Sequence, residues 1–265
     1  MMLNLQATSL LADATSNIWL PSQSSSVAGE VDFVFRFILW ISLLFFVGIV
    51  GALLHFVVRY RRRPGIAAER IVHHNASLKI AWGVIPFLLL MVIFAVGFTT
   101  FIGMAAEPDG AYEITVIGKK WVWSFQYPNG YIDDALHVPV DRPVKLVMSS
   151  DDVIHSVFIP AFRVKRDVIP GRYSSLWFRA MELGTFDLFC AEYCGTKHSD
   201  MISTVVVHPS GEFEAWLEKA SNFLETMSPA DAGKTLYKRR GCAQCHSVDG
   251  IKMVGPSFCQ LYGEP

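Results

Sequence analysis

The residues best suited to chemistry lie in one short stretch of the chain. Two cysteines four residues apart are followed by a histidine and a methionine: Cys190, Cys194, His198 and Met201. Thiolate, imidazole and thioether together form the ligand set that copper favours, whereas zinc uses cysteine and histidine but has little use for methionine. The spacing therefore predicts a metal site, and the thioether favours copper.

A fifth candidate ligand, His155, lies upstream in the stretch Asp151-Asp-Val-Ile-His-Ser156. Two cysteines, two histidines and one methionine are more than a single copper needs and match two coppers that share both sulfurs. The residues alone leave three alternatives open. They are a structural zinc site of two cysteines and two histidines, a disulfide between Cys190 and Cys194, and a purely packing role for Met201.

A second motif, Cys242-Ala-Gln-Cys245-His246, lies near the end of the chain. This spacing is typical of covalent c-type haem attachment, in which two thioethers hold the porphyrin and the histidine is an axial iron ligand. A zinc-binding hairpin is the alternative. Met253 lies too near the motif to reach the opposite face of a haem. We therefore expect residues 228–265 to form the start of a cytochrome c domain that is truncated.

Two apolar runs explain why 52% of the 265 residues are hydrophobic. They cover residues 31–58 and 78–104, and about 20 apolar residues are enough to span a membrane. The basic block Arg59-Tyr-Arg-Arg-Arg63 between them marks the cytoplasmic side. We therefore predict a transmembrane hairpin over 31–106. Residues 1–30 contain no Lys or Arg, which does not fit a secretory signal, so they are expected to form an outer-face arm.

Residues 107–209 show the pattern of an all-β domain. Short runs rich in β-branched and aromatic residues alternate with turn signals such as Pro128-Asn-Gly130. The expected strands include 144–148, 153–159, 173–178, 185–190 and 202–207. Together they predict an antiparallel sandwich or barrel that presents the candidate metal ligands at strand ends and in loops. An amphipathic helix or linker is expected over 210–227, followed by a helix over 230–239.

Together, the spans, the sandwich and the ligand loop resemble subunit II of the haem–copper cytochrome c oxidases, over about residues 30–226. The resemblance is carried by the copper motif and by four further stretches: Trp82-Gly-Val-Ile-Pro86, Trp121-Val-Trp-Ser-Phe-Gln-Tyr127, Asp152-Val-Ile-His155-Ser and Ile169-Pro-Gly-Arg172. The haem motif is similar to the caa-type branch, in which a cytochrome c domain is fused behind the copper domain. The implied fold class is a membrane-anchored α+β chain with a cupredoxin-like sandwich.

The resemblance implies a dinuclear copper (CuA) site. Cys190 and Cys194 would bridge both coppers, and His155 and His198 would each bind one. Met201 would complete one copper and the Glu192 backbone carbonyl the other, while the Glu192 side chain would reach a Mg ion at the subunit I interface.

The resemblance also implies a path for electrons. Trp121 would be an exposed indole at which they enter from cytochrome c or from a haem held by Cys242, Cys245 and His246. Asp151 and Asp152 would add acidic surface for a basic cytochrome. Lys79 stands where many members carry a Glu, so no proton-loading role is assigned to it.

The implied activity is electron transfer within an oxidoreductase and translocase of the aerobic respiratory chain. Electrons would pass from cytochrome c to haem in subunit I, where O2 is reduced and protons are pumped, because this chain has no intramembrane histidine cluster. The expected partners are subunits I and III, a cytochrome c and membrane lipid. The net charge of −1 gives no indication of a nucleic-acid partner. The chain is expected in the cell (inner) membrane with its copper domain periplasmic. The competing hypotheses are a membrane-anchored zinc module and a copper-free quinol oxidase subunit II.

Overall fold

The structure is a computed structural model that describes residues 20–65 and 74–262. The chain divides into two compact units: residues 30–103 form a helical unit, and the residues on either side of it form a second, mainly β unit. Most of the predicted N-terminal arm, residues 1–19, lies outside the described residues.

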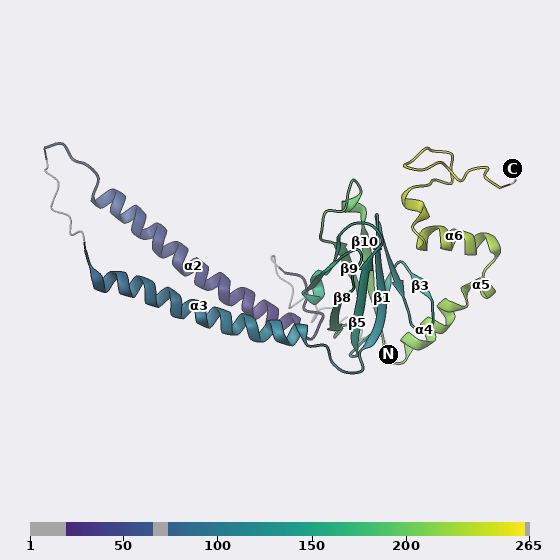
Figure 1. Cartoon of the computed structure of the whole chain (residues 1–265), viewed down its shortest axis with the longest axis horizontal. Helices are drawn as coiled ribbons and strands as arrows, with labels where there is room; N and C mark the ends of the chain where they lie inside the picture. Colours follow the sequence, from purple (N-terminus) through teal and green to yellow (C-terminus); the bar gives the residue numbers. More distant parts are fainter. Residues whose placement is uncertain (1–19, 66–73, 263–265) are drawn as a thin grey trace, which may run out of the picture. The chain divides into compact units, whose positions relative to one another are not determined.

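The helical unit contains the two predicted spans, α2 (Ala28–Arg59) and α3 (Ala76–Ala105), both visible in Figure 1. Each contains an 18-residue window of high mean hydropathy, 2.7 in α2 and 2.5 in α3, and these windows are not buried. Side chains of this kind are stable against lipid rather than water, and a helix satisfies its own backbone hydrogen bonds there. Asn75 caps α3, since its Oδ1 accepts a hydrogen bond of 2.9 Å from the Leu78 amide.

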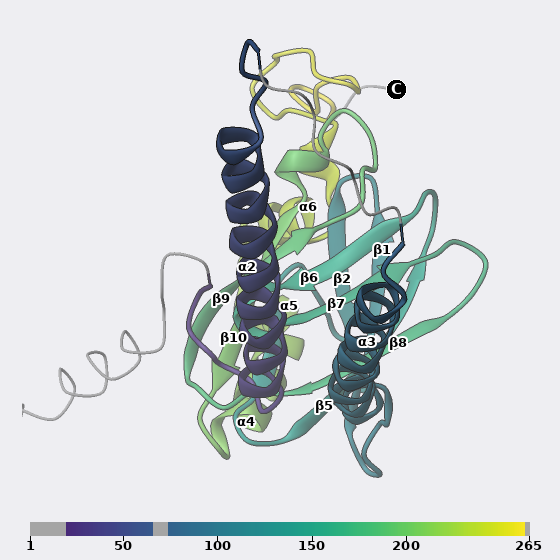
Figure 2. The same ribbon diagram turned by 90° about the vertical axis from the view of Figure 1, so that its left-hand side faces the viewer.

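The second unit is a sandwich of two five-stranded sheets (Figures 1 and 2). The first sheet has the order β3 (Ile132–Asp133), β2 (Val122–Gln126), β1 (Tyr112–Lys119), β5 (Pro143–Ser150) and β8 (Ser174–Arg179). The second has the order β4 (Leu136–Pro139), β10 (Ile202–His208), β9 (Gly184–Cys190), β6 (His155–Ile159) and β7 (Val164–Val168). The expected sandwich is confirmed.

Buried apolar residues alternate with more exposed residues along the strands, and the buried ones form the core. In β5, Val144, Leu146 and Met148 are fully buried, while the residues between them face outward. Most strand pairs are antiparallel, as predicted, but β1–β5 and β4–β10 are parallel. Strand β7 was not predicted, because three exposed polar residues, Lys165, Arg166 and Asp167, interrupt its apolar ends. This composition suits an edge strand.

Two segments outside the sheets pack on the sandwich. Near the N-terminal end, Ser25 forms a β-bridge with Ala180, and its Oγ donates to the Phe162 carbonyl at 2.8 Å. After β10 come α4 (Glu212–Ser221) and α5 (Phe223–Thr226), so the single helix expected over 210–227 is interrupted at Asn222. Helix α6 (Pro229–Arg239) begins at Ser228, whose Oγ accepts from the Asp231 amide.

A half-buried histidine pair beneath α4 makes the stability of the sandwich depend on pH. His137 Nδ1 and His208 Nε2 are 2.8 Å apart, and the His137 ring stacks on Trp216 at a centroid distance of 3.8 Å. Burial lowers the pKa of His137 to about 4 and also lowers the pKa of His208. An unfolded histidine takes up its proton near pH 6.5. Acidification below that value therefore favours the unfolded chain.

We expect the free energy of unfolding to fall as the pH drops from about 6.5 to 4, by up to about 1 kcal/mol per pH unit. The decline should end near the folded pKa of His137. Denaturant titration of the purified chain in detergent, followed by tryptophan fluorescence, measures it. The variant His137→Gln should flatten the slope. An equally steep slope in that variant would show that other groups cause it.

Candidate metal centre

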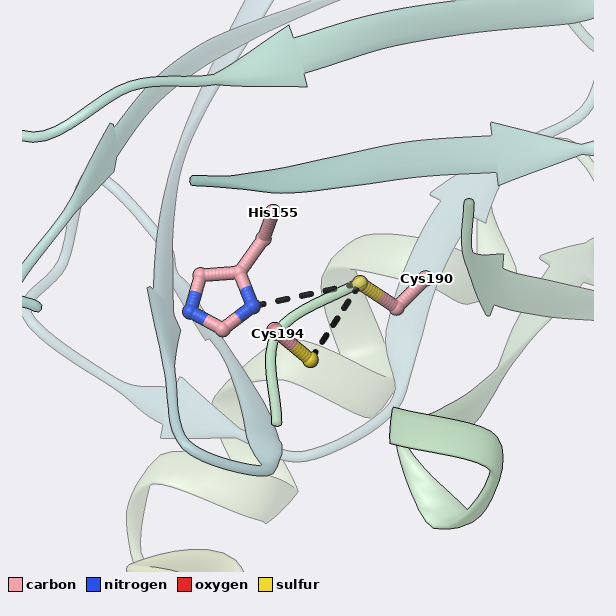
Figure 3. A group of neighbouring side chains, drawn as sticks. All are labelled: His155, Cys190 and Cys194. Atoms are coloured by element: carbon pink, nitrogen blue, oxygen red, sulfur yellow. Dashed lines mark hydrogen bonds between the residues drawn. The ribbon is translucent and has the colours of Figure 1, made fainter. Parts of the chain in front are cut away.

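The predicted ligands lie at one end of the sandwich, on neighbouring strands and the loop that joins two of them. His155 is the first residue of β6, and Cys190 is the last residue of β9. These strands are paired, with Val157 opposite Cys190. The connection from β9 to β10 carries Cys194 and the short helix η2 (His198–Asp200), and Met201 follows directly. Figure 3 shows His155, Cys190 and Cys194 pointing toward one another.

The candidate donor atoms converge. The ligand atoms of His155, Cys190 and Cys194 all lie within 4.8 Å of one another. Cys190 Sγ lies 3.8 Å from His155 Nδ1, 3.8 Å from Cys194 Sγ and 3.2 Å from the Glu192 carbonyl oxygen. Cys194 Sγ lies 3.5 Å from His198 Nδ1 and 3.8 Å from Met201 Sδ. All six groups predicted from the sequence therefore meet in one place.

Burial and sulfur geometry separate the alternatives that the sequence left open. Both cysteines are free thiols, and a sulfur separation of 3.8 Å is far longer than a disulfide bond. Met201 is buried with its thioether directed at Cys194, so it is part of the cluster rather than distant packing. The donor set therefore contains two thiol sulfurs and one thioether sulfur, which suits copper better than zinc.

Asp152 fixes the orientation of the His155 ring. Its Oδ1 lies 2.9 Å from His155 Nε2, and since a carboxylate can only accept, Nε2 carries the proton. Nδ1 is therefore the ring atom that faces Cys190, and it would be the atom available to bind a metal. The Asp152 carboxylate also accepts from the Lys120 and Val153 amides at 2.8 and 2.6 Å. Sequence reasoning had placed Asp152 on an acidic docking surface. The structure instead places it, half-buried, behind a candidate ligand.

The two thiols do not ionise alike. Burial opposes the charge on Cys190, but hydrogen bonds with the His155 ring, the Glu192 and Ser156 backbone and Cys194 together outweigh burial and lower the pKa of Cys190 to about 6. Burial and the neighbouring Cys190 charge raise the pKa of Cys194 to about 12. The metal-free pair therefore holds one negative charge at neutral pH, and a metal that binds both thiolates must displace a proton.

Two tryptophans and two glycines pack directly against the cluster. The buried Trp123 ring lies edge-on to His155 at a centroid distance of 5.9 Å. At Gly118 an added Cβ would lie 3.0 Å from His155 Cδ2, so a larger residue there would press on the ring. At Gly195, with φ +120°, an added Cβ would lie 3.3 Å from Trp121 Cζ2. Trp121 was expected to be exposed, but the structure shows it half-buried against the copper loop, which we define as residues 190–201.

The second motif forms a separate site. The short helix η3 (Cys242–Gln244) presents two half-exposed thiols, on Cys242 and Cys245. His246 Nδ1 lies 2.7 Å from the Pro256 carbonyl oxygen, which can only accept. Nδ1 is therefore protonated and Nε2 is free to bind a metal. The His246 ring also stacks on Phe258 at 4.4 Å.

Two family models match the chain. The transmembrane domain of cytochrome c oxidase subunit II matches residues 13–100, and the periplasmic domain of the same subunit matches residues 130–208. A cytochrome c oxidase subunit 2 from Alkalihalophilus pseudofirmus is 33% identical over 241 residues, covering 86% of this chain and 70% of that protein. A cytochrome c oxidase subunit 2 from Thermostichus vulcanus is 31% identical over 252 residues, covering 74% of this chain and 77% of that protein.

Among solved structures, the chain is similar to the periplasmic domain of subunit II of cytochrome oxidase (CoxB) of Bradyrhizobium japonicum. The identity is 34% and the TM-score 0.42, over 44% of this chain and 98% of that one. A haem-copper terminal oxidase dimer gives 19% identity and a TM-score of 0.37, over 50% of this chain and 97% of that one.

Proposed function

This chain belongs to the cytochrome c oxidase subunit II family, and on that premise we propose that its cluster at residues 155 and 190–201 is the dinuclear copper site. Membership makes the chain the electron-transfer subunit of a haem–copper oxidase, an oxidoreductase complex in which it pairs with subunit I. It is anchored by its two apolar helices and carries a periplasmic domain. We assign the membrane to the cell (inner) membrane of a bacterium.

The single observation that carries the copper proposal is the convergence of the donor groups. Cys190 and Cys194 would bridge the metals as thiolates, and His155 and His198 would each bind through Nδ1, the atom that faces sulfur in both cases. Met201 and the Glu192 carbonyl would complete the set. When bound, a copper pair would supply one-electron redox chemistry. The residues would hold it at strand ends and in the adjoining loop, where close packing leaves little room for movement on reduction.

Two further roles follow from the family pattern. The Glu192 side chain is exposed beside the cluster, and we assign it to a Mg ion at the subunit I interface. Trp121 is the proposed entry point for electrons, because its ring covers Gly195 within the copper loop. Subunit III and a cytochrome c complete the set of proposed partners.

The electron-transfer proposal has a direct test. The purified, copper-loaded chain is mixed with ferrous cytochrome c in a stopped-flow instrument. We expect the copper absorbance to bleach as the cytochrome becomes ferric, with one electron taken up per copper pair. A ferrous cytochrome that stays reduced beside a fully coloured chain would contradict the assignment.

We also propose that Cys242 and Cys245 attach a haem covalently and that His246 binds its iron through Nε2. The Pro256 carbonyl supports this, because it fixes the ring in the tautomer that an iron ligand needs. Expressed with haem-attachment enzymes, the wild-type chain should keep its haem absorbance after denaturation and solvent extraction. The double variant Cys242→Ala, Cys245→Ala should lose the haem and keep its copper. Extraction of haem from the wild-type chain would contradict the proposal.

A further inference from the structure

The segment that carries the haem motif contacts the copper domain at three places that the proposed function does not explain. The first joins the two loops directly: Lys197 Nζ donates to the Gln244 carbonyl oxygen at 2.5 Å, and Lys197 is half-buried there. Lys197 precedes the proposed ligand His198, and Gln244 precedes Cys245. One charge-assisted hydrogen bond thus links the two loops that would hold the cofactors.

The second contact is a close approach of backbone to side chain. Gly241 has φ +70°, and an added Cβ would lie 2.8 Å from Val122 Cγ1. Both the backbone conformation and the space therefore require glycine. Val122 follows Trp121, whose ring covers Gly195 on the copper loop. These two adjacent residues thus contact the haem-attachment turn on one side and the copper loop on the other.

The third contact anchors helix α6 to strand β3 (Figure 1). Arg239 Nη2 lies 3.5 Å from Asp133 Oδ2, and Asp133 is nearly fully buried. The Arg239 guanidinium also lies over the Tyr131 and Phe223 rings, 5.3 and 5.1 Å from their centroids. A buried carboxylate needs such a partner, and a half-buried arginine that stacks on two rings is held in one orientation.

We propose that Lys197 and Arg239 are positioning residues that hold the haem-attachment turn, residues 240–246, against the copper loop of the same chain. The inference rests on the proposed function, because only a chain that carries both haem and copper would need the turn and the copper loop to be held close together. Electron transfer between two sites requires a fixed, short separation, which these two contacts and the close approach of Gly241 to Val122 would maintain. Lys197 sets the position of the turn itself, while Arg239 anchors the helix that leads into it.

Amide hydrogen exchange of the full chain in detergent tests this docking. The readout is the exchange rate of peptides covering residues 240–246. Loss of one charge-assisted hydrogen bond in Lys197→Met should shift the docked-to-undocked ratio, and with it the exchange rate, by about tenfold. Lys197→Arg keeps a cationic donor and should restore most of the protection. Lys234→Met, an exposed lysine on α6, is the matched control and should exchange like the wild type.

Three results would overturn the proposal. They are exchange in Lys197→Met that matches the Lys234→Met control, failure of Lys197→Arg to restore protection, and loss of copper from Lys197→Met without any change in exchange at 240–246. The last would mean that Lys197 supports the copper loop alone. Failure of the proposed function would be distinguishable, because it would appear as a wild-type chain without copper, whereas the exchange comparison can be made with or without metal.

Discussion

Replacing Cys190 by serine is expected to abolish the binding of the copper pair. Cys190 Sγ has three candidate donor atoms around it, at 3.8 Å for both His155 Nδ1 and Cys194 Sγ and at 3.2 Å for the Glu192 carbonyl oxygen. A serine hydroxyl is a hard and weakly acidic group that cannot replace a bridging thiolate. Copper content, measured by elemental analysis, should fall from two ions per chain to one or none, and the visible absorbance of the copper-loaded chain should disappear.

Cys259→Ser is the matched control, because Cys259 is an exposed cysteine in the C-terminal segment and belongs to neither proposed site. It should retain both copper and colour. A Cys190→Ser chain with undiminished colour would place the chromophore elsewhere, and equal loss in both variants would point to general misfolding.

Replacing Trp123 by alanine is expected to lower the free energy of unfolding by about 3–5 kcal/mol, the usual cost of removing a large buried aromatic ring. Trp123 is 1% exposed, lies on strand β2 of the first sheet and packs edge-on to His155. The cavity would therefore open directly beside a proposed metal ligand. Denaturant titration of the full chain in detergent, with copper removed by chelation, isolates the packing effect from any loss of metal.

Tyr173→Ala is a suitable control, since this aromatic ring is 75% exposed. It should change the unfolding free energy by less than about 0.5 kcal/mol, as most surface substitutions do. A loss below about 1 kcal/mol in Trp123→Ala would mean that the sandwich collapses into the vacated space, which would contradict the rigid support that the site is thought to need.

The sequence was sufficient to predict the parts of the structure that depend on the local pattern of residues. The two spans are continuous apolar runs, and their helices end within a few residues of the predicted limits. The four ligands from Cys190 to Met201 lie in one loop, so their spacing alone brings them within reach of a common point. His155 was named from the sequence as a candidate of suitable chemistry, and the pairing of β6 with β9 explains how a residue so far upstream reaches the same point.

What the sequence did not reveal depends on contacts across the fold. Asp152 was assigned to the surface because nothing in the neighbouring sequence shows that the bend between β5 and β6 directs its carboxylate toward His155. Gly118 and Gly195 look like ordinary strand and loop glycines until an aromatic ring is placed against them. The parallel pairing of β1 with β5 and the contact from Lys197 to Gln244 join residues far apart in the chain, so no periodicity predicts them.

The central claim is tested most directly by electron paramagnetic resonance of the purified chain after copper loading and mild oxidation. We predict a hyperfine pattern from one unpaired electron shared equally between two copper nuclei, because the two thiolates and two imidazoles of the cluster would give two copper ions nearly equivalent surroundings. The hyperfine pattern of an electron confined to one copper nucleus, or a silent, colourless chain that binds zinc in its place, would contradict the account.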